Sequence, residues 1–93
     1  MQYPLKLGDL TMTSGLEHAG ITLADLEPLI TKHAHCDWGD LPPEDKELQD
    51  LAATAAEPDT GTMFMSSWKV RDDKIWIITH YGYATTCMLP EDY

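Results

Sequence analysis

The chain has 93 residues, enough for one small domain with a modest core. Sixteen acidic residues against six basic ones give a formal net charge of −10, which argues against direct binding to nucleic acid or an anionic membrane, since both need Lys and Arg. No apolar run is long enough to span a bilayer, and the N-terminus has no secretory signal pattern. We therefore expect a cytoplasmic protein with reduced thiols at Cys36 and Cys87, although their spacing leaves a disulfide open.

The first half of the sequence predicts two successive helices. A short one is expected over residues 15–19, followed by a second that opens with a capping box formed by Thr22 and Asp25. Leucines at helical spacing continue this second helix until about His35. Pro28 falls inside the pattern and predicts a kink or a restart of the helix.

A third helix is expected after Leu41. Pro42 and Pro43 suit the first turn of a helix, and the acidic residues that follow favour the positive end of its dipole. The segment 57–61 should end it. The residues expected to form its buried stripe are Leu48, Leu51, Ala52 and Ala55.

From Thr62 onward the pattern changes to short alternating strands. Three strands, at residues 62–70, 74–79 and 85–89, are joined by tight turns and predict an antiparallel meander, and residues 5–12 can add an edge strand. The fold class is therefore α+β, a single domain over residues 1–93 with about three short helices on one face of a three- to four-stranded antiparallel sheet. The residues expected in the core are Trp38, Leu48, Leu51, Ile75, Ile77 and Cys87.

Residues 33–40 contain side chains that can bind metals or act as nucleophiles. The possible ligands are His33, His35, Cys36, Asp37 and Asp40, but their spacing matches no zinc finger, CxxC pair or HExxH helix. Cys36 with His33 or His80, or Cys87 with His80, would form a Cys/His pair without any recognisable nucleophile motif. We predict no metal, no cofactor and no enzymatic activity, with a small Cys/His or metal-dependent hydrolase as the less favoured alternative.

The segment DWGDL, residues 37–41, reads as a joint between two helices. Asp37 can close an Asx-turn, Trp38 supplies a large apolar anchor, and Gly39 allows a positive φ at the bend. Asp40 is expected to cap the third helix and Leu41 to enter its apolar stripe. Each residue of the segment therefore has a structural role.

Several motifs together resemble a family of small bacterial proteins carried by plasmids, phages and other mobile elements. The matching positions are His33, residues 37–41, Asp45, Ser66, Ser67, residues 76–79, residues 85–86 and the segment from Leu89 to Tyr93. The His35–Cys36 pair and the YGYA turn depart from the family pattern. The resemblance implies a setting, a mobile element in a bacterial host, rather than a chemical reaction.

The strongest functional indication is the acidic stretch over residues 37–59, where eight acids face one lysine for a balance of −7. Such acids either keep a small protein soluble or bind a basic protein surface. Because mobile elements must evade nucleic-acid-handling host defences, this favours a DNA mimic, an inhibitor of anti-CRISPR or anti-restriction type. The alternative is an antitoxin-like or regulatory adaptor, and exposed aromatic residues are also compatible with a homodimer. The predicted partner-binding residues are Asp40, Glu44, Glu47, Asp50 and Glu57.

Overall fold

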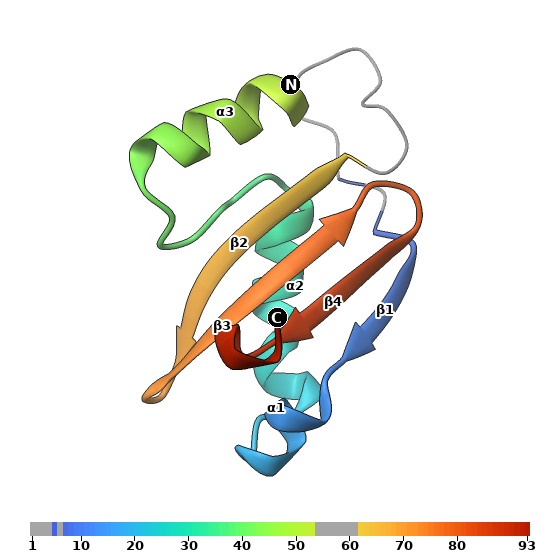
Figure 1. The fold of residues 1–93 in the computed structure, drawn as a ribbon, viewed down its shortest axis with the longest axis vertical. Helices are drawn as coiled ribbons and strands as arrows, with labels where there is room; N and C mark the ends of the chain where they lie inside the picture. The colour runs from blue at the N-terminus through green and yellow to red at the C-terminus, as the bar shows by residue number, and fades with distance from the viewer. Residues whose placement is uncertain (1–4, 6, 54–61) are drawn as a thin grey trace.

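The computed structural model describes residue 5, residues 7–53 and residues 62–93. It shows the predicted α+β class, with three helices and a mixed, mostly antiparallel sheet in the order β1-β4-β3-β2 (Figure 1). The elements in chain order are β1 (Asp9–Met12), α1 (Ser14–His18), α2 (Leu23–Ala34), α3 (Pro43–Ala53), β2 (Met63–Val70), β3 (Asp73–His80), β4 (Ala84–Met88) and the 3₁₀ turn η1 (Pro90–Asp92). The predicted end of the third helix, at residues 57–61, lies outside the described residues.

The sheet combines the predicted meander with one parallel strand. β2, β3 and β4 pair antiparallel in sequence order, whereas β1 runs parallel to β4, with Asp9 opposite Ala84 and Met12 opposite Cys87. The expected edge strand is therefore present, but the expectation of an entirely antiparallel sheet was wrong. No tight turn joins β1 to its neighbour, because the rest of the chain lies between them, and a long connection permits the parallel direction.

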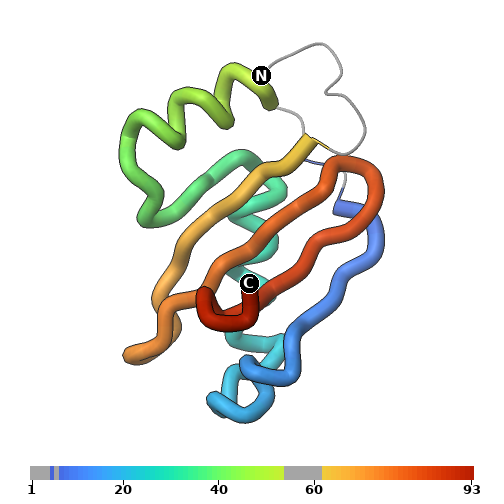
Figure 2. The backbone as a smooth tube through the Cα atoms, in the orientation of Figure 1, coloured from blue at the N-terminus to red at the C-terminus, as the bar shows by residue number. Residues whose placement is uncertain are grey.

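Helices α1 and α2 lie on one face of the sheet and enclose the main core. Figure 1 shows α2 running behind the strands, while Figure 2 shows the C-terminal turn in front of them, on the opposite side. On that front side, Tyr93 packs edge-on against Trp76 with 5.8 Å between ring centroids. The core between α2 and the sheet contains Leu16, Ile21, Leu26, Trp68, Ile75, Ile77, Cys87 and Leu89. The predicted burial of Ile75, Ile77 and Cys87 is confirmed.

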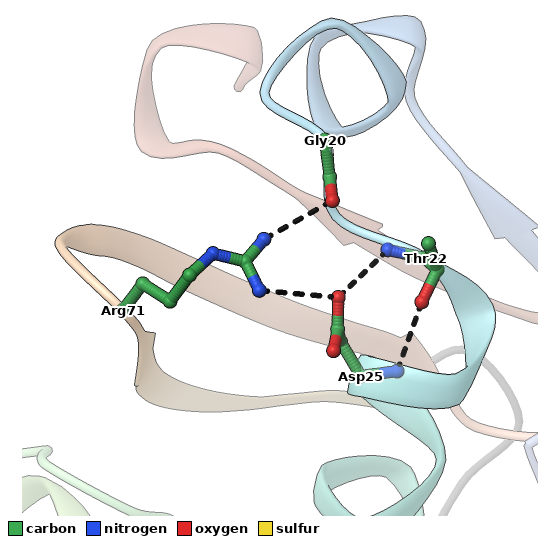
Figure 3. A network of polar contacts seen from close by, with 4 residues as sticks. All are labelled: Gly20, Thr22, Asp25 and Arg71. Carbon is green, nitrogen blue, oxygen red and sulfur yellow. Dashed lines mark hydrogen bonds and ion pairs between the residues drawn. The ribbon is translucent and has the colours of Figure 1, made fainter.

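The start of α2 is fixed by the predicted capping box and by an arginine from the turn between β2 and β3 (Figure 3). The Asp25 amide donates to Thr22 Oγ1 at 3.3 Å, and the Thr22 amide donates to Asp25 Oδ2 at 3.0 Å. Arg71, in the β2–β3 turn, lies 3.6 Å from the same Asp25 carboxylate and donates to the Gly20 carbonyl at 3.1 Å. Pro28 lies inside α2, which continues to Ala34 without the predicted restart.

A second, smaller core lies beside α3 and is centred on Trp38. This side chain is 2% exposed and stacks on Phe64 with 5.7 Å between ring centroids, so its predicted anchoring role is confirmed. Leu5 and Cys36 complete the buried part of this cluster. Among residues 5, 7–53 and 62–93, no helix has the length and apolar character that crossing a bilayer requires.

Helix α3 does not lie on the sheet face with the other two helices, and this corrects the predicted packing. Figure 1 shows it off the β2 edge. No residue of α3 is buried, and the two leucines expected in the core, Leu48 and Leu51, are 67% and 65% exposed. The half-buried Ala52 packs against the Trp38 cluster, and the fourth member of the expected stripe, Ala55, lies outside the described residues.

Candidate functional site

His33, one of the candidate metal ligands, is fully buried between α2 and the sheet. Its Nδ1 lies 2.7 Å from Ser66 Oγ on β2, and its Nε2 lies 2.8 Å from Thr79 Oγ1 on β3. Both ring nitrogens are therefore used in hydrogen bonds within the protein. His35 instead faces solvent, with its Nδ1 2.8 Å from the Thr31 carbonyl oxygen.

The hydrogen bonds of His33 belong to a chain with a fixed direction. One end is an indole N–H, which only donates, and the other is a backbone carbonyl, which only accepts. The chain runs through Trp68 Nε1, Ser66 Oγ, the His33 ring, Thr79 Oγ1, Thr85 Oγ1 and the Leu7 carbonyl. If every hydroxyl donates onward, the imidazole is neutral and bears its proton on Nε2. Burial lowers the pKa of this ring from 6.5 to about 4, which favours the same neutral form.

The two cysteines are buried free thiols on separate parts of the fold. Burial raises the pKa of Cys87 from 9.0 to about 11. The pKa of Cys36 is also raised, mainly by burial and to a smaller extent by the negative charge of the nearby Asp50 carboxylate. A reactive cysteine needs the opposite shift. Cys87 faces the α2 core, whereas His80, one residue along the strand from the α2-facing Thr79, points to the other face of the sheet, so these two side chains do not form the pair considered above.

The DWGDL joint closes against the edge of β2. Asp37 Oδ1 accepts from the Gly39 amide at 3.0 Å, which confirms the Asx-turn, and Gly39 has φ +66°. The Asp40 amide donates to the Ser67 carbonyl at 2.7 Å. Helix α3 starts at Pro43, three residues after Asp40, so the prediction that Asp40 caps it was wrong. The Asp40 backbone instead pairs with the edge of β2.

Polar side chains attach α3 to the rest of the fold. The Gln49 amide group pairs with the Met65 backbone on β2, accepting from its N–H at 2.6 Å and donating to its carbonyl at 2.7 Å. Asp50 Oδ1 accepts from Trp38 Nε1 at 2.9 Å. A helix held in this way can turn its apolar residues outward, which explains the exposure of its leucines.

The outer face of α3 consists of carboxylates and leucines. At 3.6 residues per turn, Glu44, Glu47, Leu48 and Leu51 fall on one side of the helix, and all four are exposed. On a helix, residues three or four positions apart have Cβ atoms about 5–6 Å from each other, so these four side chains are neighbours on one face. Within the part of the chain that the structure describes, the one ion pair is Arg71–Asp25, so neither glutamate is paired with a described cation.

The five predicted partner-binding residues have different environments. Asp40, Glu44 and Glu47 are exposed, Asp50 is half-buried by its bond to Trp38, and Glu57 lies outside the described residues. The structure therefore brings Glu44 and Glu47 together on α3, with Asp40 in the loop that leads to it. Sequence reasoning missed Leu48 and Leu51 as surface residues, because the same helix offers a second stripe at Gln49, Asp50 and Ala53.

A shallow groove of about 270 Å³ lies beside the outer face, between α3 and β2. The residues lining this α3 groove are Leu41, Asp45, Leu48, Gln49, Met63 and Met65. Four of the six are apolar, and Asp45 supplies a carboxylate.

No protein family, curated protein or solved structure matches this chain in sequence or fold comparisons.

Proposed function

We propose that this is a non-enzymatic binding protein that engages a basic protein partner through the outer face of α3. The observation that supports this proposal is the orientation of α3. The helix contacts the rest of the fold through Gln49 and Asp50, and its leucines, which were expected to be buried, are exposed to solvent together with its glutamates. Exposed apolar side chains that lie together and are rimmed by polar residues are typical of protein interaction sites. Helices that bind protein grooves use such a stripe of apolar residues one turn apart.

Charge determines the kind of partner. The chain has a formal charge of −10, and two of its acids, Glu44 and Glu47, lie next to the leucines on the outer face. A surface of this kind attracts a basic partner and accelerates its association. A protein that holds nucleic acid in a basic channel fits this description, which keeps an inhibitor of a host defence protein, of anti-CRISPR or anti-restriction type, within the proposal.

The exposed leucines support a second candidate, an antitoxin-like or regulatory adaptor. A DNA mimic needs only spaced negative charges, whereas the 67% exposed Leu48 side chain is better suited to contact with an apolar surface. The two candidates differ in competition with nucleic acid. Duplex DNA or RNA should displace a DNA mimic from its partner and should leave an adaptor bound.

The test begins with a partner retained from a bacterial lysate and then measures that partner's binding kinetics. The double charge reversal Glu44→Lys/Glu47→Lys should reduce the association rate by about tenfold or more at low salt and much less at high salt, because exposed charges are screened over about 10 Å at 0.1 M ionic strength. Its matched control is Glu17→Lys/Glu27→Lys, which makes the same charge change on exposed residues of α1 and α2. Equal association rates for the two double variants would refute the proposal.

A further inference from the structure

The α3 groove has the size and lining of a socket for one apolar side chain. At about 270 Å³ it is smaller than the roughly 300–1,000 Å³ typical of small-molecule pockets. Its apolar walls come from three separate segments: Leu41 from the loop, Leu48 from α3, and Met63 and Met65 from β2. Leu48 is 67% exposed and Met63 is 49% exposed, so both offer apolar surface that a bound side chain would cover.

The polar members of the groove have separate roles. The Gln49 side chain already pairs with the Met65 backbone and forms a fixed wall. Asp45 is exposed, and within residues 5, 7–53 and 62–93 its carboxylate has no ion-pair partner. The Glu44 side chain, on the preceding position of α3, is exposed as well. A cation seated at the groove would therefore meet negative charge, whereas an anionic group would be repelled.

We propose that the α3 groove binds an apolar anchor residue, Leu or Met in type, from a cationic segment of a partner protein, with a neighbouring Lys or Arg against Asp45. This rests on the proposed function and specifies its partner. The apolar walls of the groove favour an apolar side chain of the partner, and the Asp45 carboxylate favours a neighbouring cation. Two methionines suit an adaptable socket, because their unbranched, polarisable side chains adjust to the shape of the guest.

An anchor and a charged rim affect different rate constants. Desolvated anchor residues near the centre of an interface dominate the dissociation rate, and rim charges mainly alter the association rate and its salt dependence. Leu48→Ser should therefore increase the dissociation rate of the partner by about tenfold without altering the salt dependence. Leu23→Ser, which truncates a similarly exposed leucine on α2 (47% exposed), is the matched control.

A direct test uses two fluorescent peptides as probes, both built from lysine and alanine, of which one has a single central leucine. Binding is followed by NMR through backbone amides and through the methionine methyl groups, with Met12 and Met88 as internal references. Both peptides should shift the amides of Glu44 and Glu47. Only the leucine peptide should shift the methyl groups of Met63 and Met65, and Leu48→Ser should reduce its affinity to that of the alanine peptide.

The outcomes separate this inference from the proposed function. If the leucine peptide shifts the α3 amides but not the Met63 and Met65 methyls, the groove is not the anchor site and the acidic face alone binds. If neither peptide affects α3, the proposed function fails with the inference. Concentration-dependent shifts of the same methyls in the peptide-free protein would assign the groove to a second copy of this chain and overturn the inference.

Discussion

The buried ring of His33 predicts that the fold loses stability between pH 6.5 and pH 4. Above pH 6.5 this ring is neutral in both the folded and the unfolded chain. Burial lowers the pKa of this ring from 6.5 to about 4. Between these two pH values the unfolded chain binds a proton that the folded chain excludes, so the free energy of unfolding decreases as the pH falls. One pKa unit corresponds to about 1.4 kcal/mol, so the whole difference amounts to about 3 kcal/mol, lost once the pH falls below 4.

The hydrogen-bond chain gives a geometric reason for this magnitude. An imidazolium donates from both nitrogens, so the Ser66 oxygen would receive donors from His33 and from Trp68, and the Ser66 hydroxyl proton would lose its acceptor. The other groups around the ring are the Thr79 hydroxyl and the edge-on Trp38 indole, with 5.6 Å between ring centroids. None of these contacts supplies a negative charge to offset the proton.

Urea unfolding followed by tryptophan fluorescence measures the effect, because Trp38 and Trp68 are both buried. Wild type, His33→Leu and the control His35→Gln are compared from pH 7 to pH 4. His33→Leu should be less stable at pH 7, by about 1–3 kcal/mol for each hydroxyl that it leaves unpaired, but should lose the pH dependence. The control should keep it. A wild-type unfolding free energy that stays constant from pH 6.5 to 4, or an imidazole that titrates near pH 6.5 by NMR in the folded protein, would refute the reasoning.

Three further predictions concern the second core, the loop against β2 and the thiol in the main core. Trp38→Ala should cost about 3–5 kcal/mol in urea unfolding, and an unchanged midpoint would contradict its role as an anchor. Gly39→Ala should cost more than about 2 kcal/mol, since φ is +66° and a Cβ would collide with the Ser67 carbonyl. Gly20→Ala has φ +76° in open space and should show only the backbone strain; equal losses for the two glycines would disprove the collision. Because burial raises the pKa of Cys87 from 9.0 to about 11, the free energy of unfolding should fall by about 3 kcal/mol as pH rises through this range, and Cys87→Ala should flatten that decline.

The sequence was a reliable guide wherever structure depends on neighbouring residues. The capping box of Thr22 and Asp25 and the Asx-turn of Asp37 are set by contacts two or three residues apart, and the three-strand meander by short turns between neighbouring strands; all are present. Alternation of side chains along β3 also placed Ile75 and Ile77 in the core correctly. Local pattern was sufficient in each of these cases.

Predictions failed where distant residues decide the outcome. The orientation of α3 follows from Gln49 meeting the Met65 backbone and Asp50 meeting Trp38, and neither partner is visible from the helix itself. An apolar stripe is therefore no proof of burial when a helix docks through hydrogen bonds. The part played by His33 likewise depends on strand hydroxyls that only the folded sheet brings to it, more than 30 residues further along the chain.

The two edges of the sheet differ in their capacity to recruit another strand. On the β2 edge, Gln49 and the loop at Asp40 occupy backbone groups of Met65 and Ser67. On the β1 edge, Leu10 is exposed. The Asp9 and Thr13 amides donate to carbonyls on the β4 side, and because amide directions alternate along a strand, the Leu10 amide points away from β4. Since open edges template strand addition, we expect any strand pairing with another chain to take place at the β1 edge. Opening the β2 edge would require displacing both α3 and the Asp40 loop, so these two segments together leave β1 as the edge that is open to another strand.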